Sequence, residues 1–380
     1  MGDDRVEIVH LAGVRLDPAC GLLRRWTRAE ALRDADYTDN YDRRTLVYDC
    51  FWHPVRRAHV FVAPPFLNLW RPFRRGLSHD GQPARGARRR FYTRSEQVVL
   101  PGAAGALAVG LGGATYEVPV RAWQAPRFAG LDCIFTMNKD NDLDWIRAWA
   151  AHHIARHGAE GVVIFDNGST AYGLEELAAT LRGVPGLKAG LVYAVPFPYG
   201  PRRSRIGRLE RGAKFLQSAT LNLARVDALA RARGVLNVDI DEVVAGPAGI
   251  SIFEAARAHW LGLVSFDGEW IYPAPGAAWP APQAAHSHRV TPRNSCSTKW
   301  CVVPGRGFGR GLQWDVHRIG GGLQHLLARD DRFERLHCRA CSTGWKAGRM
   351  QPPTGALRHD PGLEAVFDAG PVAGRLDRAV

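Results

Sequence analysis

The pattern of hydrophobic and polar positions changes at about residue 127. Before that point, short apolar runs alternate with Gly, Pro and Arg clusters, and only Leu22 to Asp34 has helical periodicity. This pattern is typical of short strands, so we expect residues 1–127 to form a β-rich N-terminal domain. Its expected strands are Val6 to Val9, Thr45 to Phe51, His59 to Phe66, Phe91 to Leu100 and Ala114 to Val120.

From Leu131 onward, strand patterns alternate with helix patterns. Strands that alternate with helices predict a parallel sheet with right-handed crossovers, and such sheets bind ligands at the carboxyl ends of their strands. The expected elements are a strand at Asp132 to Met137, a helix that ends at Gly158, a strand at Gly161 to Phe165, a helix at Leu174 to Leu181, a strand at Leu187 to Val195 and a helix from about Glu210 to Arg233.

The most informative stretch is Val235 to Val244, an apolar run that contains Asp239, Asp241 and Glu242. If one strand runs through it, the two-residue period places Asp239 and Asp241 on the same side. Adjacent carboxylates repel each other unless a cation lies between them, and Mg²⁺ or Mn²⁺ held by one or two carboxylates usually binds substrate phosphates too. The stretch therefore predicts a metal site for a nucleotide diphosphate, and a solvated turn is the alternative.

Composition predicts a globular chain, since 46% of its 380 residues are hydrophobic. There is no long uncharged apolar run, and the first 25 residues are too charged for a signal peptide. We therefore expect a cytoplasmic protein, and peripheral association with the inner face of the membrane stays open. The seven scattered cysteines predict reduced thiols, and the single Cys338-x-x-Cys341 pair is weak support for zinc.

The formal charge of +13 comes from arginine, because the chain has only five lysines. Arginine suits anionic partners. Eight arginines fall in the expected loop Arg71 to Arg94, together with Phe73, Phe91 and Tyr92. A basic loop with interleaved aromatic rings suits single-stranded nucleic acid, a membrane surface or an acidic glycan, and a solvated loop is the plain alternative.

Several motifs stand in an order that carries a family resemblance. They are Asn138, a helix with Trp145 and His153, GVVIFDNGST at 161–170, a helix with Gln217 and Asn222, VDIDEVV at 238–244, Lys299-Trp300, His317 and LHCRACSTGWK at 336–346. In this order the chain resembles bacterial glycosyltransferases of the GT-A fold related to families 2 and 92. The resemblance covers Leu131 to Arg349 and leaves residues 1–127 uncovered.

The resemblance implies an α/β fold. A Rossmann-like GT-A domain would occupy residues 128–350, after the β-rich domain and before a C-terminal tail at 351–380. It also implies a nucleotide-sugar donor whose base and ribose contact Asp166, Asn167 and Ser169, with Asn138 lining the same pocket.

The resemblance further implies that Asp239 and Asp241 hold Mn²⁺ or Mg²⁺ against the donor diphosphate. His317 would be the third metal ligand, and His337 is the competing candidate. Arg339 or Lys346 would stabilise the departing diphosphate.

A transferase of this kind needs a carboxylate that takes the proton from the acceptor hydroxyl. Downstream of the acidic stretch, Phe266 to Trp270 offers Asp267 and Glu269 beside aromatic rings that suit a sugar. We expect these two residues to be catalytic, with Asp315 as second choice. Asp-Gly is also a strong hairpin signal, so an ordinary turn is the alternative.

The implied function is metal-dependent, inverting transfer of a sugar to a glycan or lipid-linked acceptor, in surface polysaccharide synthesis and without nucleic acid. Two other classes stay open. One is a non-catalytic glycan- or nucleic-acid-binding protein that uses Arg71 to Arg94. The other is a sugar nucleotidyltransferase, although residues 137–144 lack the glycine-rich loop expected of that class.

Overall fold

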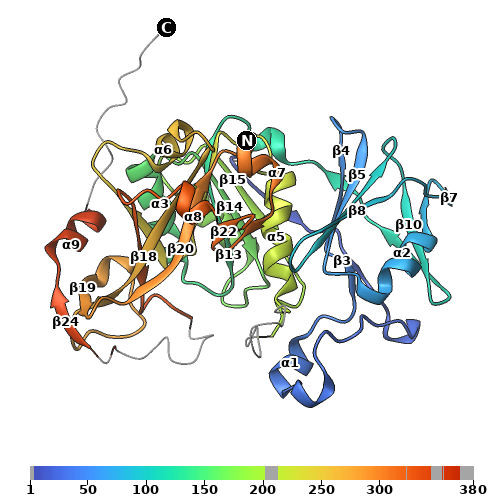
Figure 1. The fold of residues 1–380 in the computed structure, drawn as a ribbon, viewed down its shortest axis with the longest axis horizontal. Helices are drawn as coiled ribbons and strands as arrows, with labels where there is room; N and C mark the ends of the chain where they lie inside the picture. The colour runs from blue at the N-terminus through green and yellow to red at the C-terminus, as the bar shows by residue number, and fades with distance from the viewer. Residues whose placement is uncertain (1–3, 202–212, 322, 344–352, 354, 369–380) are drawn as a thin grey trace, which may run out of the picture. The chain divides into compact units, whose positions relative to one another are not determined.

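The computed structural model describes residues 4–201, 213–321, 323–343, 353 and 355–368 (Figure 1). The chain forms two compact units, each built from segments distant in sequence. The sheet unit, as we call it, contains Met1–Val9, Arg127–Tyr193 and Leu229–Val380, and the β-rich unit contains His10–Pro126 and Ala194–Ala228. The units therefore interleave along the chain, unlike the linear ranges 1–127, 128–350 and 351–380 expected from sequence.

The sheet unit is built on an 11-stranded mixed sheet in the order β1-β15-β14-β13-β16-β20-β18-β19-β24, with β23 paired to β18 and β17 paired to β23. At its centre β13 is parallel to both β14 and β16, with Asn138 opposite Asp166. The α/β class is confirmed. The strands are β1 (Val6–His10), β13 (Asp132–Asn138), β14 (Gly161–Asp166), β15 (Ala189–Ala194), β16 (Gly234–Asn237), β17 (Glu242–Ala245), β18 (Leu263–Pro273), β19 (His286–Thr291), β20 (Ser295–Val302), β23 (Glu334–Cys338) and β24 (Ala356–His359).

Helices cover this sheet because their apolar stripes match it. In α3 (Leu143–His157), Ile146, Trp149 and Ala150 are buried in the core that β13, β14 and β16 also line. Asp142 caps the helix start, and Gly158, in the left-handed conformation, ends the helix where the sequence predicted. The remaining elements are α4 (Leu174–Arg182), α6 (Ile252–Ala258), α7 (Gly307–Gly311), α8 (Gln324–Leu327), α9 (Pro361–Asp368), β21 (Trp314–Asp315), β22 (Arg318–Ile319), η4 (Ala125–Phe128) and η5 (Gln283–Ala285).

Both chain ends contribute to the sheet. The β1 strand, expected in the N-terminal domain, lies beside β15, where Gly190 leaves no room for a Cβ next to Val6. In the segment expected as a tail, β24 pairs antiparallel with β19. Local patterns could not give these pairings, because each partner is distant in sequence.

The acidic stretch Val235 to Val244 is not one strand. Strand β16 ends at Asn237 and β17 begins at Glu242, whose N–H donates to Asp239 O at 3.0 Å. We call residues 239–242 the acidic turn. The expectation that Asp239 and Asp241 share one strand face is therefore wrong, since a turn interrupts the two-residue alternation.

The β-rich unit contains a five-stranded sheet, β12-β4-β5-β9-β8, and a four-stranded sheet, β11-β10-β6-β7. The strand predicted at Phe91 to Leu100 is a hairpin, because Tyr92 N donates to Ser95 O at 2.9 Å. The elements are β2 (Val14–Arg15), η1 (Pro18–Cys20), η2 (Glu30–Leu32), α1 (Ala35–Asn40), β3 (Thr45–Val47), β4 (Asp49–His53), β5 (Ala58–Ala63), η3 (Leu67–Leu69), α2 (Trp70–Gly76), β6 (Leu77–His79), β7 (Gln82–Pro83), β8 (Arg88–Phe91), β9 (Glu96–Pro101), β10 (Leu107–Leu111), β11 (Ala114–Val118), β12 (Arg121–Ala122) and α5 (Phe215–Val226).

All seven cysteines are free thiols, as the sequence predicted. No helix within the described residues has the length and apolar content needed to cross a membrane.

Candidate functional site

The carboxyl ends of β13 and β14 carry a buried polar cluster. Asn138 Nδ2 donates to Asp166 Oδ1 at 2.7 Å, and Asn138 and Asp166 are each 2% exposed. Ser169 donates to the same carboxylate through its Oγ, at 2.5 Å, and through its backbone N–H, at 2.9 Å. Parallel pairing places Asn138 directly opposite Asp166, so the register of the two strands creates the cluster. The structure thus brings together three of the four residues expected at the nucleoside pocket.

The fourth expected residue, Asn167, lies at the rim of this cluster. It is part-exposed, its N–H donates to Asn138 O at 2.8 Å, and its carbonyl accepts from Lys139 Nζ at 3.3 Å. Sequence reasoning missed Tyr172, whose hydroxyl accepts from Asn138 Nδ2 at 2.8 Å. Tyr172 follows the D-N-x-S-T motif by only two residues, and an amphipathic tyrosine beside a polar turn was the available signal.

Glu242 is the anchor of the acidic turn. Its side chain is 1% exposed, and its Oε2 accepts from Asp239 N–H at 2.9 Å and lies 3.0 Å from Lys299 Nζ. Its Oε1 accepts from Arg335. Burial alone would raise the pKa of Glu242, but Arg335 and Lys299 outweigh burial and hold that pKa at about 2. Glu242 is therefore ionised and fixes the shape of the turn.

Gly268 makes room for the Arg335 guanidinium. It lies on β18 opposite Arg335 on β23, and a Cβ at position 268 would lie 2.6 Å from Arg335 Nε and 2.7 Å from Cys296 Sγ. The Asp-Gly pair at 267 and 268 is therefore not a hairpin turn. It lies within an 11-residue strand, β18, with a bulge between Phe266 and Gly268.

His337 is the imidazole that contacts the acidic turn. Antiparallel pairing of β17 with β23 sets His337 opposite Glu242, and its Nε2 is 3.0 Å from Asp241 Oδ2. Its ring stacks on Trp270, with centroids 3.6 Å apart, and Arg339 lies over the Trp270 ring at 4.9 Å. Strand pairing on one side and ring stacking on the other fix the orientation of His337.

The acidic turn fits a hard divalent cation. Asp241, Glu242 and His337 each offer one ligand atom, and these atoms lie within 4.8 Å of one another. Within the described part of the chain, the buried Nδ1 of His337 has no hydrogen-bond partner, and it lies 3.7 Å from Glu242 Oε1. When Nε2 donates to Asp241, Nδ1 carries the lone pair that a cation requires. Carboxylate oxygen and imidazole nitrogen together suit Mn²⁺, and the carboxylates also suit Mg²⁺.

The other expected donor-site residues lie in different settings. Asp239 is 43% exposed and bonds to Lys299 Nζ at 3.1 Å. His317 lies against β20, where its Nδ1 bonds to Thr298 O at 3.1 Å and its Nε2 to Ser297 Oγ at 3.3 Å. Burial and then Lys299 lower the pKa of His317. Lys346, the alternative to Arg339, lies outside the described residues.

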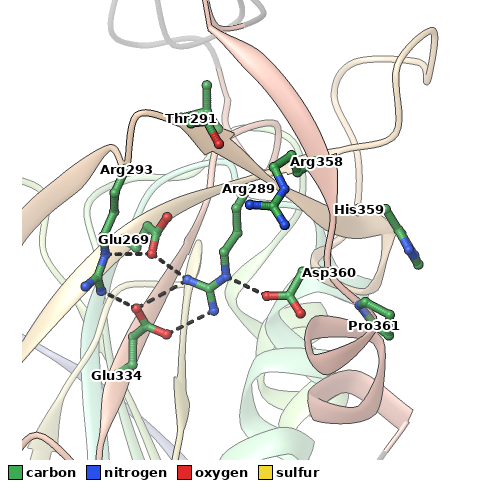
Figure 2. A pocket seen from close by; sticks show the side chains of 10 residues that line it. Glu269, Arg289, Thr291, Arg293, Glu334, Arg358, His359, Asp360 and Pro361 are labelled. Atoms are coloured by element: carbon green, nitrogen blue, oxygen red, sulfur yellow. Dashed lines mark hydrogen bonds and ion pairs between the residues drawn. The ribbon is translucent and has the colours of Figure 1, made fainter.

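Glu269 lies on the opposite sheet face from His337. Trp270, the next residue on β18, stacks on His337, and neighbouring strand residues point to opposite faces. Glu269 is buried and accepts from Arg289 at 2.5 Å and from Arg293 at 2.8 Å. Figure 2 shows this carboxylate between the two guanidinium groups, in an open pocket of about 630 Å³ that Glu334 and Asp360 also line. This placement removes Glu269 from the acceptor side of the acidic turn.

Asp267 is also committed elsewhere. Its side chain is 44% exposed and pairs with Arg329 at 3.0 Å. Asp315, the second choice for the base, is buried on β21 and accepts from Val316 N–H at 2.8 Å. The described contacts bring neither aspartate to the acidic turn.

The arginine-rich segment Arg71 to Arg94 is not a loop, because it contains most of α2 and all of β6, β7 and β8. Arg71, Arg74, Arg75, Arg88 and Arg90 are exposed, and Phe91 is 65% exposed on the edge strand β8. Arg89 pairs with Glu96 at 2.5 Å and lies 4.1 Å from the Phe91 ring centroid. Some of the arginine and aromatic side chains of this segment therefore pack against each other within the β-rich unit.

The chain matches no protein-family model and no curated protein. Solved structures similar to part of it include the mannosyltransferase Ktr4p from S. cerevisiae, with 10% identity and a TM-score of 0.27 over 38% of this chain and 41% of that chain. The bifunctional glycosyltransferase WbbM has 15% identity and a TM-score of 0.22 over 37% of this chain and 23% of its own. S. aureus TarS has 12% identity and a TM-score of 0.27 over 55% of this chain and 58% of its own. The match spans less than two thirds of each of these three proteins.

Proposed function

We propose that this chain is a metal-dependent glycosyltransferase of the GT-A type that moves a sugar from a nucleotide-sugar donor to a glycan or lipid-linked acceptor. The observation that carries the proposal is the acidic turn with His337, which follows β16 at the carboxyl edge of the parallel strands. The ends of the neighbouring strands β13 and β14 carry Asn138 and Asp166 at the same edge. Open α/β sheets bind nucleotides at this edge.

The residues of the strand-end cluster would form the nucleoside side of the site. Asn138 and Asp166 are buried and hydrogen-bonded to each other, so they would provide a rigid wall. Asn167 and Tyr172 are part-exposed and would make direct contacts with the base or ribose. A wall that is rigid before the donor binds lowers the entropy cost of binding.

The acidic turn would hold the diphosphate side of the donor through Mn²⁺ or Mg²⁺. Asp241, Glu242 and His337 are the proposed ligands, with Asp239 at the open side of the turn, and His337 replaces His317 in this role. When bound, the metal neutralises the charge that develops on the leaving diphosphate. Arg339, which lies over Trp270, would add a positive charge beside His337.

Glu269 and Asp267 are both paired with arginines, which sets them apart from the acidic turn. Inversion at the anomeric carbon, a role in surface polysaccharide synthesis and contact with the membrane rest on the family resemblance and the basic charge.

The test is donor turnover and binding with UDP-, GDP-, CMP- and dTDP-sugars, each with Mn²⁺ or with EDTA. We expect one donor to be bound and slowly hydrolysed with Mn²⁺, and Asp241→Asn to abolish both. The matched control is Asp267→Asn, which removes a carboxylate of the same sheet unit and should behave as wild type. A protein that binds no donor and is unaffected by Asp241→Asn would contradict the proposal and favour the binding-protein alternative, which uses Arg71 to Arg94.

A further inference from the structure

The side chain of Lys299 is buried against the acidic turn. It lies on β20, and its side chain has no exposed surface. Its Nζ is 3.1 Å from Asp239 Oδ2 and 3.0 Å from Glu242 Oε2. The ammonium group thus joins the exposed first carboxylate of the turn to the buried last one.

The Lys299 ammonium is a fixed positive charge. Two carboxylates lie within 3.1 Å of its Nζ, so the charged form of this buried side chain is stabilised. Arg335 adds a second buried positive charge on Glu242. Any metal ion at this turn therefore approaches carboxylates that already neutralise resident cations.

This arrangement works against a metal ion that binds alone. A divalent ion held by the turn lies close to the Lys299 ammonium, and like charges repel each other. The repulsion is screened least on the Glu242 side, where both side chains are buried. A diphosphate changes the balance, because it brings negative charge and additional oxygen ligands. Mg²⁺ and Mn²⁺ commonly combine one or two carboxylates with substrate phosphates.

We propose that Lys299 is a resident counter-charge that makes the acidic turn bind a divalent cation together with a diphosphate and disfavours the bare cation. This inference rests on the proposed function, since it assigns the turn to a metal and a nucleoside diphosphate. Lys299 acts as a positioning residue, because its contacts are with Asp239 and Glu242. A purely structural lysine would neutralise Glu242 without linking the binding of metal and diphosphate.

The test is equilibrium dialysis of Mn²⁺ against the full chain, first alone and then with UDP, GDP, CDP or dTDP. In wild type we expect the best nucleoside diphosphate to raise Mn²⁺ affinity at least about tenfold. Lys299→Met should bind Mn²⁺ alone about tenfold more tightly and retain less than about threefold enhancement. Lys299→Arg keeps the charge and should retain the enhancement, and Lys188→Met, at an exposed lysine of the same unit, is the matched control.

The outcomes separate the two proposals. Mn²⁺ binding with equal enhancement in wild type and Lys299→Met would overturn the role of Lys299 and leave the metal site in place. Absence of Mn²⁺ binding to wild type with every nucleotide would overturn the proposed function and this inference together. If Lys299→Met does not fold, the wild-type measurement alone tests the inference. A best nucleoside diphosphate that raises the Mn²⁺ affinity of wild type by less than about threefold would contradict it.

Discussion

The two ends of the same parallel strands carry ion networks of different character. At the amino end, Asp132 at the start of β13 bonds to Arg257 and Arg233, both at 2.7 Å. Glu160, just before β14, bonds to Arg233 at 2.6 Å and to Lys188 at 2.7 Å. Each carboxylate has two cationic partners, so we interpret this network as one that stabilises the fold and call it the amino-end brace.

At the carboxyl end the network is built around the acidic turn. Glu242 has cationic partners in Lys299 and Arg335, and Asp241 lies 3.0 Å from His337 Nε2. Among the described residues, the Nδ1 of that imidazole has no hydrogen-bond partner. The proposed metal site lies at this edge, where open α/β sheets bind ligands, whereas the network at the other edge is proposed to stabilise the fold.

Loss of the amino-end brace should have the largest effect on stability. Asp132→Ala removes the buried carboxylate that Arg233 and Arg257 share, and loss of these charge-assisted hydrogen bonds costs about 3 kcal/mol. Urea denaturation would measure this change in the free energy of unfolding. Donor binding by the folded variant should be unchanged, and a specific loss of donor binding would remove the distinction between the two ends.

Acid should weaken the carboxyl-end network through Glu242. The pKa of Glu242 is about 2 in the folded protein and ordinarily 4.5, so its ionised form stabilises the fold above about pH 5. This contribution, about 3 kcal/mol, is lost as the pH falls toward 2. Urea denaturation from pH 6 to pH 3 should show a shallower loss of stability for Glu242→Gln than for wild type. If the free energy of unfolding falls equally with pH in both proteins, the ion pairs of Glu242 do not stabilise the fold.

A smaller effect is expected where the backbone makes room for Arg335. Gly268→Ala places a methyl group 2.6 Å from Arg335 Nε, so the guanidinium must shift from Glu242. Overpacking of this kind costs about 1–2 kcal/mol. Thermal unfolding would measure the loss, and Gly305→Ala, at a glycine with open space, is the control. Equal melting temperatures for the two variants would show that Arg335 adapts without cost.

The sequence predicted the parts of the fold that depend on neighbouring residues. The α3 helix carries its own cap at Asp142 and its own stop at Gly158. Asp166 and Ser169 lie three residues apart, so their hydrogen bonds form within one turn. The carboxyl-edge position of Asn138 followed from the end of an apolar run.

Other placements depend on pairing between distant strands. His337 reaches the turn because β23 pairs with β17, and the sequence order alone favoured His317. Glu269 is a residue type that can act as a catalytic acid or base. In the structure it bonds to arginines from β19 and the loop that follows, and these partners are distant from it in sequence. A turn between β16 and β17 also has no signature in an apolar run, so Asp239 and Asp241 were expected on one strand.

Metal binding at the acidic turn is tested most sharply by Mn²⁺ affinity in the presence of nucleoside diphosphates, compared between wild type, Asp241→Asn and Lys188→Met. We expect at least about 100-fold weaker Mn²⁺ binding for Asp241→Asn, because a carboxylate ligand is lost, with wild-type affinity for Lys188→Met. Equal Mn²⁺ affinity in all three folded proteins would show that the acidic turn is a brace like the amino-end network and holds no metal.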